Sequence, residues 1–214
     1  MDEPNRDAPA DHGRRRLLGG LAVGGAAVVG GVAGAGATRA FSGGFVRQRV
    51  AFDVANRPDL WREADVTTAG GVATPEGENR RTFCVEGVIY PEGTIPDGPG
   101  FVVTLDDAIG RWFCRGWLII DDNRPEPHMN TDQQYFFGAV DPTDMFPADT
   151  LMSSGVEGAL SDTWQTVRAV TGGTGRYLGA TGAIVQRQIG TNTIVVDDFA
   201  GPNLRFEADL LLPA

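Results

Sequence analysis

Short apolar runs that recur between turn residues are the feature that most constrains the fold of this chain. Beyond Ala40, these runs are rich in β-branched and aromatic residues and are separated by clusters of Gly, Pro and Asp. No window longer than about ten residues shows a convincing apolar period of 3.6, so the pattern predicts strands. We expect strands at 45–54, 82–90, 100–105, 111–120, 134–140, 149–157, 164–171, 180–188 and 204–211, and a short helical turn at 58–64.

Consecutive strands joined by short turns predict a meander, in which each strand pairs with the next. Turn chemistry such as Pro91-Glu92-Gly93 separates the runs. About eight strands leave two exposed edges unless the sheet closes on itself. We therefore expect an all-β domain, an eight-stranded antiparallel meander β-barrel, with the long polar stretches 67–80 and 121–132 at its mouths.

The N-terminal segment has the order of an export signal. A polar stretch leads into Arg14-Arg15-Arg16-Leu17-Leu18, an uncharged run extends to residue 37, and Ala35-Gly36-Ala37 supplies a small-x-small cleavage pattern. We expect residues 1–37 to be a twin-arginine signal peptide of a bacterial protein that is secreted or held in the cell envelope. The mature domain is then 38–214, with no stable membrane insertion. The alternative is an uncleaved membrane anchor, because the run is long enough to span a bilayer.

Charge and histidine content narrow the classes of partner. The chain has 18 Lys plus Arg against 28 Asp plus Glu, a net charge of −10, which disfavours binding to a phosphate backbone. We expect no nucleic-acid partner. His128 is the only histidine after residue 37, so neither a metal site nor a Ser-His-Asp triad is expected, and no cofactor is implied.

Both cysteines, Cys84 and Cys114, lie within the predicted mature domain. An oxidising exterior permits a disulfide between them, and two cysteines allow only one intramolecular pairing. The alternative is that both are free, because each lies in an apolar strand-like run where small buried thiols are common.

A glycine-rich segment carries the most specific motif. Gly172-Gly173-Thr174-Gly175-Arg176-Tyr177-Leu178-Gly179 superficially resembles a nucleotide-binding loop, but the following residues are predicted as a strand rather than a helix. We interpret the glycines as residues of a tight turn. The longer segment 169–182 resembles the signature of plant allene oxide cyclases, which has a close variant in dirigent proteins. The resemblance extends upstream to Leu151-Met152-Ser153-Ser154-Gly155 and is good over 134–188.

This resemblance implies an eight-stranded antiparallel barrel with a mainly apolar lumen. In that superfamily the barrel receives a reactive small molecule and controls the stereochemistry of its ring closure or coupling. Holding a flexible substrate in one near-attack conformer can by itself lower the reaction barrier by several kcal/mol, on the order of the smaller effects of this kind in intramolecular reactions. A motif that marks a turn specifies a fold, and the fold does not fix the substrate.

The resemblance also suggests a first catalytic candidate. Asp53 falls where allene oxide cyclases carry a lumen glutamate and dirigent proteins an aspartate, so we expect Asp53 to point into the lumen as a general base or cation stabiliser. Phe52 and Val54 would then face outward. The alternative is a solvent-facing strand acid. Ala55 and Leu118 replace an asparagine and a cysteine of the cyclases, which argues against literal allene oxide cyclase activity.

Two further charged residues are catalytic candidates. Strand alternation places Glu86 on one face with Cys84, Val88 and Tyr90, so this acid could be buried, although an exterior position is the commoner one. Arg115 could pair with Glu86 or with Asp53.

Aromatic residues could line a ligand cavity, although barrel core or a subunit interface is the commoner role. The ligand-binding candidates are Trp112, Trp117, Tyr135, Phe137 and Tyr90.

The sequence thus predicts a cofactor-free cyclase or isomerase. Its substrate would be a small apolar metabolite, polyketide-, oxylipin- or terpenoid-like, that closes a ring inside the barrel. The main alternative is a non-catalytic, lipocalin-like carrier or dirigent-type binding protein, and a third is a structural domain with a filled barrel. The barrel could assemble as a homodimer or a homotrimer.

Overall fold

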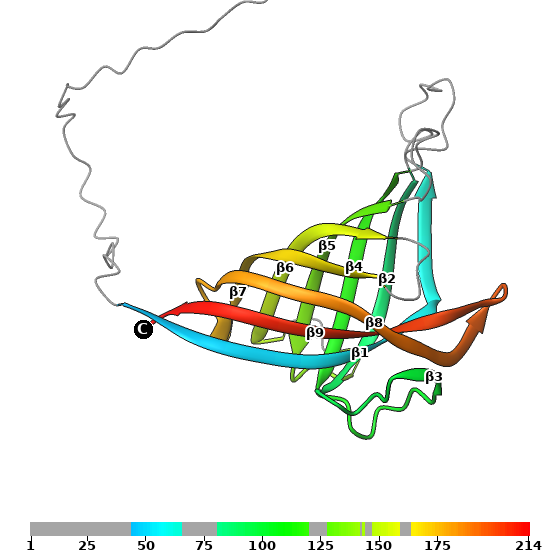
Figure 1. Cartoon of the computed structure of the whole chain (residues 1–214), viewed down its shortest axis with the longest axis horizontal. Helices are drawn as coiled ribbons and strands as arrows, with labels where there is room; N and C mark the ends of the chain where they lie inside the picture. The colour runs from blue at the N-terminus through cyan, green and yellow to red at the C-terminus, as the bar shows by residue number, and fades with distance from the viewer. Residues whose placement is uncertain (1–43, 66–80, 120–127, 142, 144–146, 159–163) are drawn as a thin grey trace, which may run out of the picture. The chain divides into compact units, whose positions relative to one another are not determined.

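The computed structural model describes residues 44–65, 81–119, 128–141, 143, 147–158 and 164–214. These described residues lie almost entirely in strands (Figure 1). These are β1 (Phe45–Asp65), β2 (Arg81–Pro91), β3 (Gly98–Phe101), β4 (Gly110–Ile119), β5 (His128–Phe137), β6 (Asp149–Gly158), β7 (Gln165–Thr174), β8 (Thr181–Val196) and β9 (Phe199–Pro213). No helix in the described ranges is long and apolar enough to cross a membrane.

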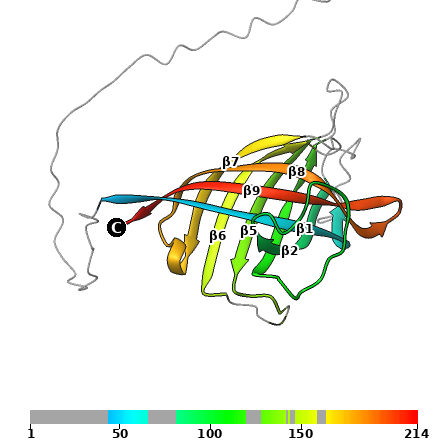
Figure 2. The same ribbon diagram turned by 60° about the horizontal axis from the view of Figure 1, so that its bottom comes forward.

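Eight of these strands form a closed antiparallel barrel, which confirms the predicted fold. Their order is β8-β7-β6-β5-β4-β2-β1-β9, and pairing of β9 with β8 closes the sheet. Figures 1 and 2 show β9 between β8 and β1. Closure removes the two sheet edges that a meander would otherwise expose.

The run predicted at 100–105 does not join the meander. Instead, β2 pairs directly with β4, and the short β3 pairs in parallel with β8. The two backbones approach closely at Gly190, where a Cβ atom would lie 1.8 Å from the carbonyl oxygen of Gly98. Residues 92–109, here called the outer flap, therefore leave the barrel wall and cover part of its outer face (Figure 1).

Three local predictions need correction. The turn expected at 58–64 is part of β1, with a register irregularity between Arg57 and Arg62 that accommodates Pro58. The stretch 128–132, predicted as connection, is the first half of β5. The hairpin that extends β8 and β9 was not predicted; it turns at Asp197 and Asp198 with φ of 49° and 64°.

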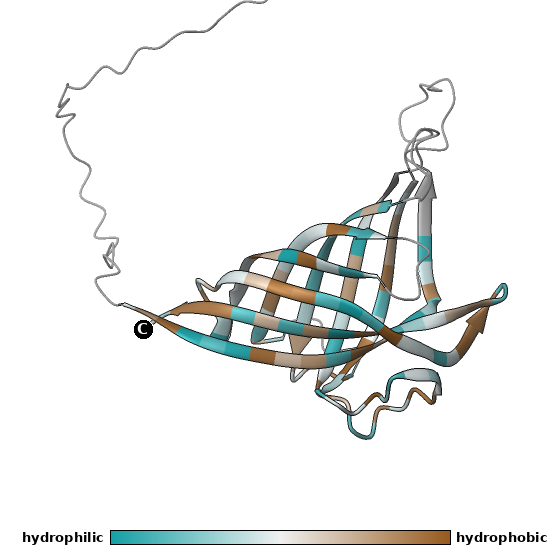
Figure 3. Cartoon of the chain, in the orientation of Figure 1, coloured by the Kyte–Doolittle hydropathy of each residue, from teal (hydrophilic) through white to brown (hydrophobic). Residues whose placement is uncertain are grey.

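The barrel wall separates two apolar clusters. Side chains alternate between the two faces of a strand, and Figure 3 shows hydrophilic and hydrophobic residues alternating along several strands. The larger cluster lies inside the barrel and includes Phe52, Tyr135, Phe137 and Phe206. The Phe52 ring lies 5.1–5.4 Å from the other three ring centroids, so these rings fill one end of the lumen. The smaller cluster lies under the outer flap and consists of Ala55, Val88, Tyr90, Ile95 and Ile189.

The glycine-rich motif is a tight turn, as the sequence predicts. β7 ends in it, and a single 3₁₀ turn at Gly175–Tyr177 leads toward β8. Gly175 has φ of +57°, and a Cβ atom there would lie 2.4 Å from the carbonyl oxygen of Ala148. Glycine is therefore required for this backbone geometry.

Candidate functional site

A buried ion pair lies inside the barrel. Arg168 of β7 donates from Nη1 to Oε1 of Glu157 on β6 at 2.6 Å, and the two side chains are 0% and 6% exposed. Arg168 also donates from Nε to the Ser153 hydroxyl at 3.0 Å and from Nη2 to the Thr131 carbonyl oxygen at 2.9 Å. These bonds hold the guanidinium in one orientation.

A second set of hydrogen bonds extends this pair across the lumen. Gln133 of β5 donates from Nε2 to Glu157 Oε1 at 2.6 Å and to Gln186 Oε1 of β8 at 3.1 Å. The Tyr135 hydroxyl donates to Gln133 Oε1 at 2.7 Å and lies 3.0 Å from the Ser153 hydroxyl. Strands β5 and β8 are separated in the sheet by β6 and β7, so these side chains can meet only through the interior.

These seven buried residues are here called the lumen cluster: Thr131, Gln133, Tyr135, Ser153, Glu157, Arg168 and Gln186.

The Glu157 carboxylate uses its two oxygens unequally. Oε1 accepts hydrogen bonds from Thr131 Oγ1, Gln133 Nε2 and Arg168 Nη1, whereas Oε2 has no donor among the described residues. The 2.6 Å contact between Arg168 Nη1 and Glu157 Oε1 makes the two side chains an ion pair. Oε2 can therefore accept a hydrogen bond, or a proton, from a bound molecule.

Burial keeps the Tyr135 hydroxyl and the Cys114 thiol in their neutral forms. Desolvation raises the pKa of the Tyr135 hydroxyl, and it raises the pKa of the Cys114 thiol well above its usual value, with the Glu157 charge adding to the effect. Tyr135 therefore acts as a neutral hydrogen-bonding group, and Cys114 as a small apolar residue.

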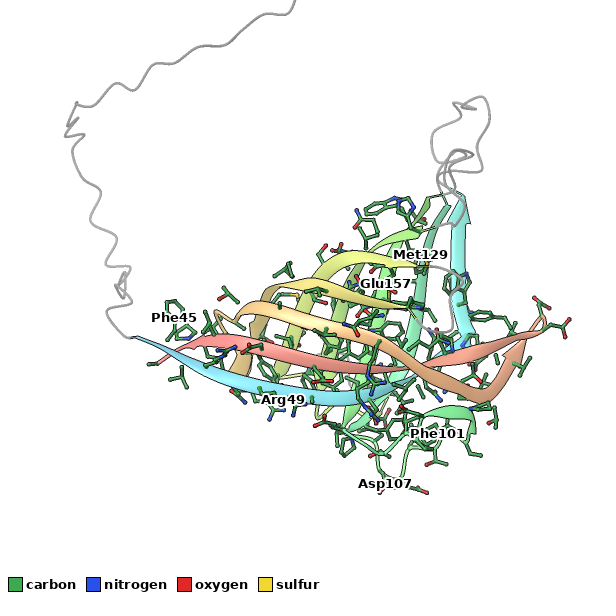
Figure 4. All side chains as sticks on the ribbon, in the orientation of Figure 1. Phe45, Arg49, Phe101, Asp107, Met129 and Glu157 are labelled. Carbon is green, nitrogen blue, oxygen red and sulfur yellow. The ribbon has the colours of Figure 1, made fainter. Side chains whose placement is uncertain are left out.

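Apolar side chains surround the end of the lumen nearest to Glu157. Trp61, Phe83, Met129 and Trp164 pack against the interior, and the Trp61 and Phe83 rings stack at 4.4 Å and 7°. Met129 is the cross-strand partner of Glu157, and Figure 4 shows both labelled residues on adjacent strands. We call these four residues the apolar collar.

Asp53 does not point into the lumen, so the predicted orientation is wrong. Phe52 and Val54 belong to the interior cluster, which places Asp53 on the opposite face, under the outer flap. Its carboxylate accepts two hydrogen bonds from Arg205, at 2.6 and 3.1 Å. Asp53 also accepts the backbone N–H groups of Gly93 and Ile95. The flap makes both faces of β1 apolar, so alternation alone could not identify the inner face.

The other predicted site residues are divided between the two faces. Glu86 shares a face with Cys84 and Tyr90, as expected, but this is the outer face, because Val85 lies inside. Arg115 pairs with neither Glu86 nor Asp53; the acid beside it is Asp132, at 3.9 Å.

The aromatic candidates divide in the same way. Trp112, Tyr135 and Phe137 lie in the lumen, with Phe137 at the filled end. Tyr90 is buried under the outer flap, where its hydroxyl donates to the Thr104 carbonyl oxygen at 2.5 Å. Trp117 is 50% exposed and, with Arg62, Cys84 and Arg115, lines an outer groove of about 430 Å³.

The cysteines are free, and no disulfide joins them. Cys114 lies opposite Val85 in the β2–β4 pair, whereas Cys84 lies opposite Arg115. This one-residue offset places the two thiols on opposite faces of the sheet, which prevents bonding without movement of the backbone.

Glu157 and Arg168 were not predicted from the sequence. Alternate residues of a strand share a face. Glu157 is therefore expected on the same face as the apolar Leu151, and Arg168 on the same face as Val170. That pattern could have marked them as inward-facing acids and bases. No group of three His, Cys, Asp or Glu residues suited to a metal ion occurs in the part of the chain that the structure describes.

Comparison with known proteins supports the fold. The sequence matches no protein-family model and no curated protein. Among solved structures, the pterocarpan synthase dirigent protein GePTS1 has a TM-score of 0.50 and 13% identity, covering 80% of this chain and 93% of that chain. For the pterocarpan synthase dirigent protein PsPTS1 these values are 0.43, 14%, 78% and 94%; for a pyocyanin demethylase they are 0.44, 13%, 76% and 99%. The likeness to GePTS1 shows that this chain has the dirigent-like barrel fold.

Proposed function

We propose that the barrel binds a small, mainly apolar metabolite through the apolar collar and guides its intramolecular cyclisation or isomerisation without a cofactor. The observation that carries this proposal is the Glu157 carboxylate, paired with Arg168 inside the lumen and left with an Oε2 atom to which no described residue donates. A few precisely placed polar groups inside an otherwise apolar interior are typical of a small-molecule site.

The proposed chemistry uses position and charge. Glu157 Oε2 accepts the proton of a substrate hydroxyl, or stabilises positive charge that develops during ring closure. Arg168, Gln133 and Thr131 fix the carboxylate before the substrate arrives, so no reorganisation is needed at the moment of reaction. The aromatic walls confine the chain of the substrate to a conformation that closes the ring.

A non-catalytic carrier is the second candidate, and one feature favours it. Glu157 is already paired with Arg168, and a carboxylate in an ion pair can accept a hydrogen bond from a ligand without any proton transfer. GePTS1, which shares the fold, is a pterocarpan synthase dirigent protein. That likeness suggests a reaction type to test, whereas the lumen cluster is what supports small-molecule chemistry in this chain.

The test compares two acid-to-amide variants. Apolar alcohols with a polyene, terpenoid or aromatic skeleton are incubated with the wild type, Glu157→Gln and Glu86→Gln, the last being the matched outer-face control. The wild type should return one stereoisomer of a cyclised product, and Glu157→Gln should lower the rate about 10²–10⁴-fold. The control should keep the wild-type rate. Return of every bound alcohol unchanged would favour the carrier, and failure to bind any would contradict both candidates.

The proposal includes export. We expect residues 1–37 to be removed, because the twin arginines, uncharged run and Ala-x-Ala site occur in order. N-terminal sequencing of the exported protein should begin at Thr38, and recovery of an intact N-terminus in a membrane fraction would contradict cleavage.

A further inference from the structure

Two hydrogen-bond donors in the lumen have no acceptor among the described residues. They are Nε2 of Gln186 and Nε1 of Trp112, on side chains that are 0% and 2% exposed. Nearly all buried polar groups are paired in folded proteins, because an unpaired one loses its hydration without compensation. Both donors therefore point to an acceptor that comes from outside the chain.

The hydrogen-bond network fixes which end of the Gln186 amide faces the lumen. An ionised carboxylate can only accept, so Gln133 must turn its NH₂ group toward Glu157, and the same NH₂ group also donates to Gln186 Oε1. If the Gln186 amide were reversed, two NH₂ groups would face each other. Gln186 thus presents its own NH₂ group as a donor, and the indole of Trp112 can only donate.

The two donors flank the same aromatic pair. Trp112 is the cross-strand partner of Tyr135, and Gln186 is the partner of Phe206. The Tyr135 and Phe206 ring centroids are 5.2 Å apart. Both donors therefore lie next to the packed aromatic rings, of which Tyr135 is also a member of the lumen cluster.

We propose, building on the proposed function, that the ligand is a neutral aromatic or polyunsaturated compound with a carbonyl oxygen that accepts hydrogen bonds from Gln186 and Trp112. A pure hydrocarbon would leave both donors unpaired. A carboxylate would place a second negative charge near Glu157, while Arg168 is already held by Ser153, Thr131 and Glu157. Within the metabolite classes expected from the sequence, this favours neutral ketones and lactones over fatty-acid-like anions.

Three probes of similar size test the inference: 2-acetylnaphthalene, 2-ethylnaphthalene and 2-naphthoate. Isothermal titration calorimetry with the wild type should show the ketone binding about 5- to 100-fold more tightly than the hydrocarbon, the range expected for two net hydrogen bonds. The anion should bind most weakly. Gln186→Met and Trp112→Phe remove one donor each and should reduce the preference for the ketone. Gln165→Met and Trp117→Phe change exposed residues and should preserve it.

A second measurement covers the case in which a lumen variant does not fold. The infrared stretching band of ¹³C-carbonyl 2-acetylnaphthalene should lie at lower frequency in the wild-type complex than in hexane, because a hydrogen bond weakens the C=O bond. Equal affinity for ketone and hydrocarbon, or an unshifted band, would overturn the inference while leaving lumen binding in place. Absence of binding by all three probes would overturn the inference together with the proposed function.

Discussion

Two buried acid–arginine pairs, one on each face of the barrel wall, use their carboxylates differently. Under the outer flap, Asp53 accepts from Arg205 through both oxygens and from two backbone N–H groups of the flap. In the lumen, Glu157 accepts three donors on Oε1 alone. The outer pair is saturated by the protein, whereas the inner pair keeps one oxygen to which no described residue donates.

This difference distinguishes a carboxylate that holds a neighbouring segment of the chain from one that can bind a ligand. A saturated carboxylate that bonds the backbone of a neighbouring segment holds that segment in place, as Asp53 holds residues 93–95 of the outer flap. The side-chain hydrogen bonds to Asp53 also raise the pKa of Arg205. An incompletely satisfied network costs stability, and proteins tolerate that cost chiefly at functional sites. Breaking each pair in turn tests this distinction.

The largest effect is expected when the lumen pair is broken. Arg168→Met leaves a buried carboxylate without its cation, and the free energy of unfolding should fall by about 3–5 kcal/mol. Arg187→Met is the control, because Arg187 is one-third exposed and lies 3.6 Å from Asp97; it should cost about 1 kcal/mol or less. Urea unfolding measures both. Equal costs for the two variants would contradict the burial of the Arg168 charge.

Breaking the outer pair should have a smaller and local effect. Asp53→Asn removes the charge that Arg205 binds but keeps the side-chain shape, and stability should fall by about 1–3 kcal/mol. Hydrogen exchange at the Gly93 and Ile95 amides should accelerate most, because Asp53 accepts both. A loss of about 10²–10⁴ in turnover without faster exchange would instead support the general-base role inferred from the sequence.

The sequence predicts the barrel, but it does not predict which face of each strand points into the lumen. Strand runs, turn residues and the glycine motif are local signals, so eight strands and a tight turn at Gly175 could be predicted. Alternation defines two faces of a strand but not which one is inside, and the outer flap buries Ala55 as fully as the lumen buries Val54. The Glu157–Arg168 pair depends on how β6 and β7 align, which includes a register irregularity between Met152 and Ser153. No local pattern encodes that alignment.

The smallest effect concerns the two thiols. Cys84 is half-buried on the outer face, whereas burial raises the pKa of Cys114 in the lumen and suppresses the reactive thiolate. With 5,5′-dithiobis(2-nitrobenzoate), the native protein should react at Cys84, and Cys114 should react only after denaturation. Cys84→Ser should abolish the native reaction, and rapid labelling of Cys114 in the folded protein would contradict its placement inside the barrel.

The most direct test asks where a ligand binds. In ¹⁵N-labelled protein titrated with 2-acetylnaphthalene, the indole N–H signal of Trp112 and the side-chain NH₂ signals of Gln186 should shift. The indole N–H of Trp117, in the outer groove, should stay in place and serves as an internal control. That result would place the ligand in the lumen, beside Glu157 and Arg168. A shift confined to Trp117 would contradict a functional lumen, because binding would then occur on the outer face.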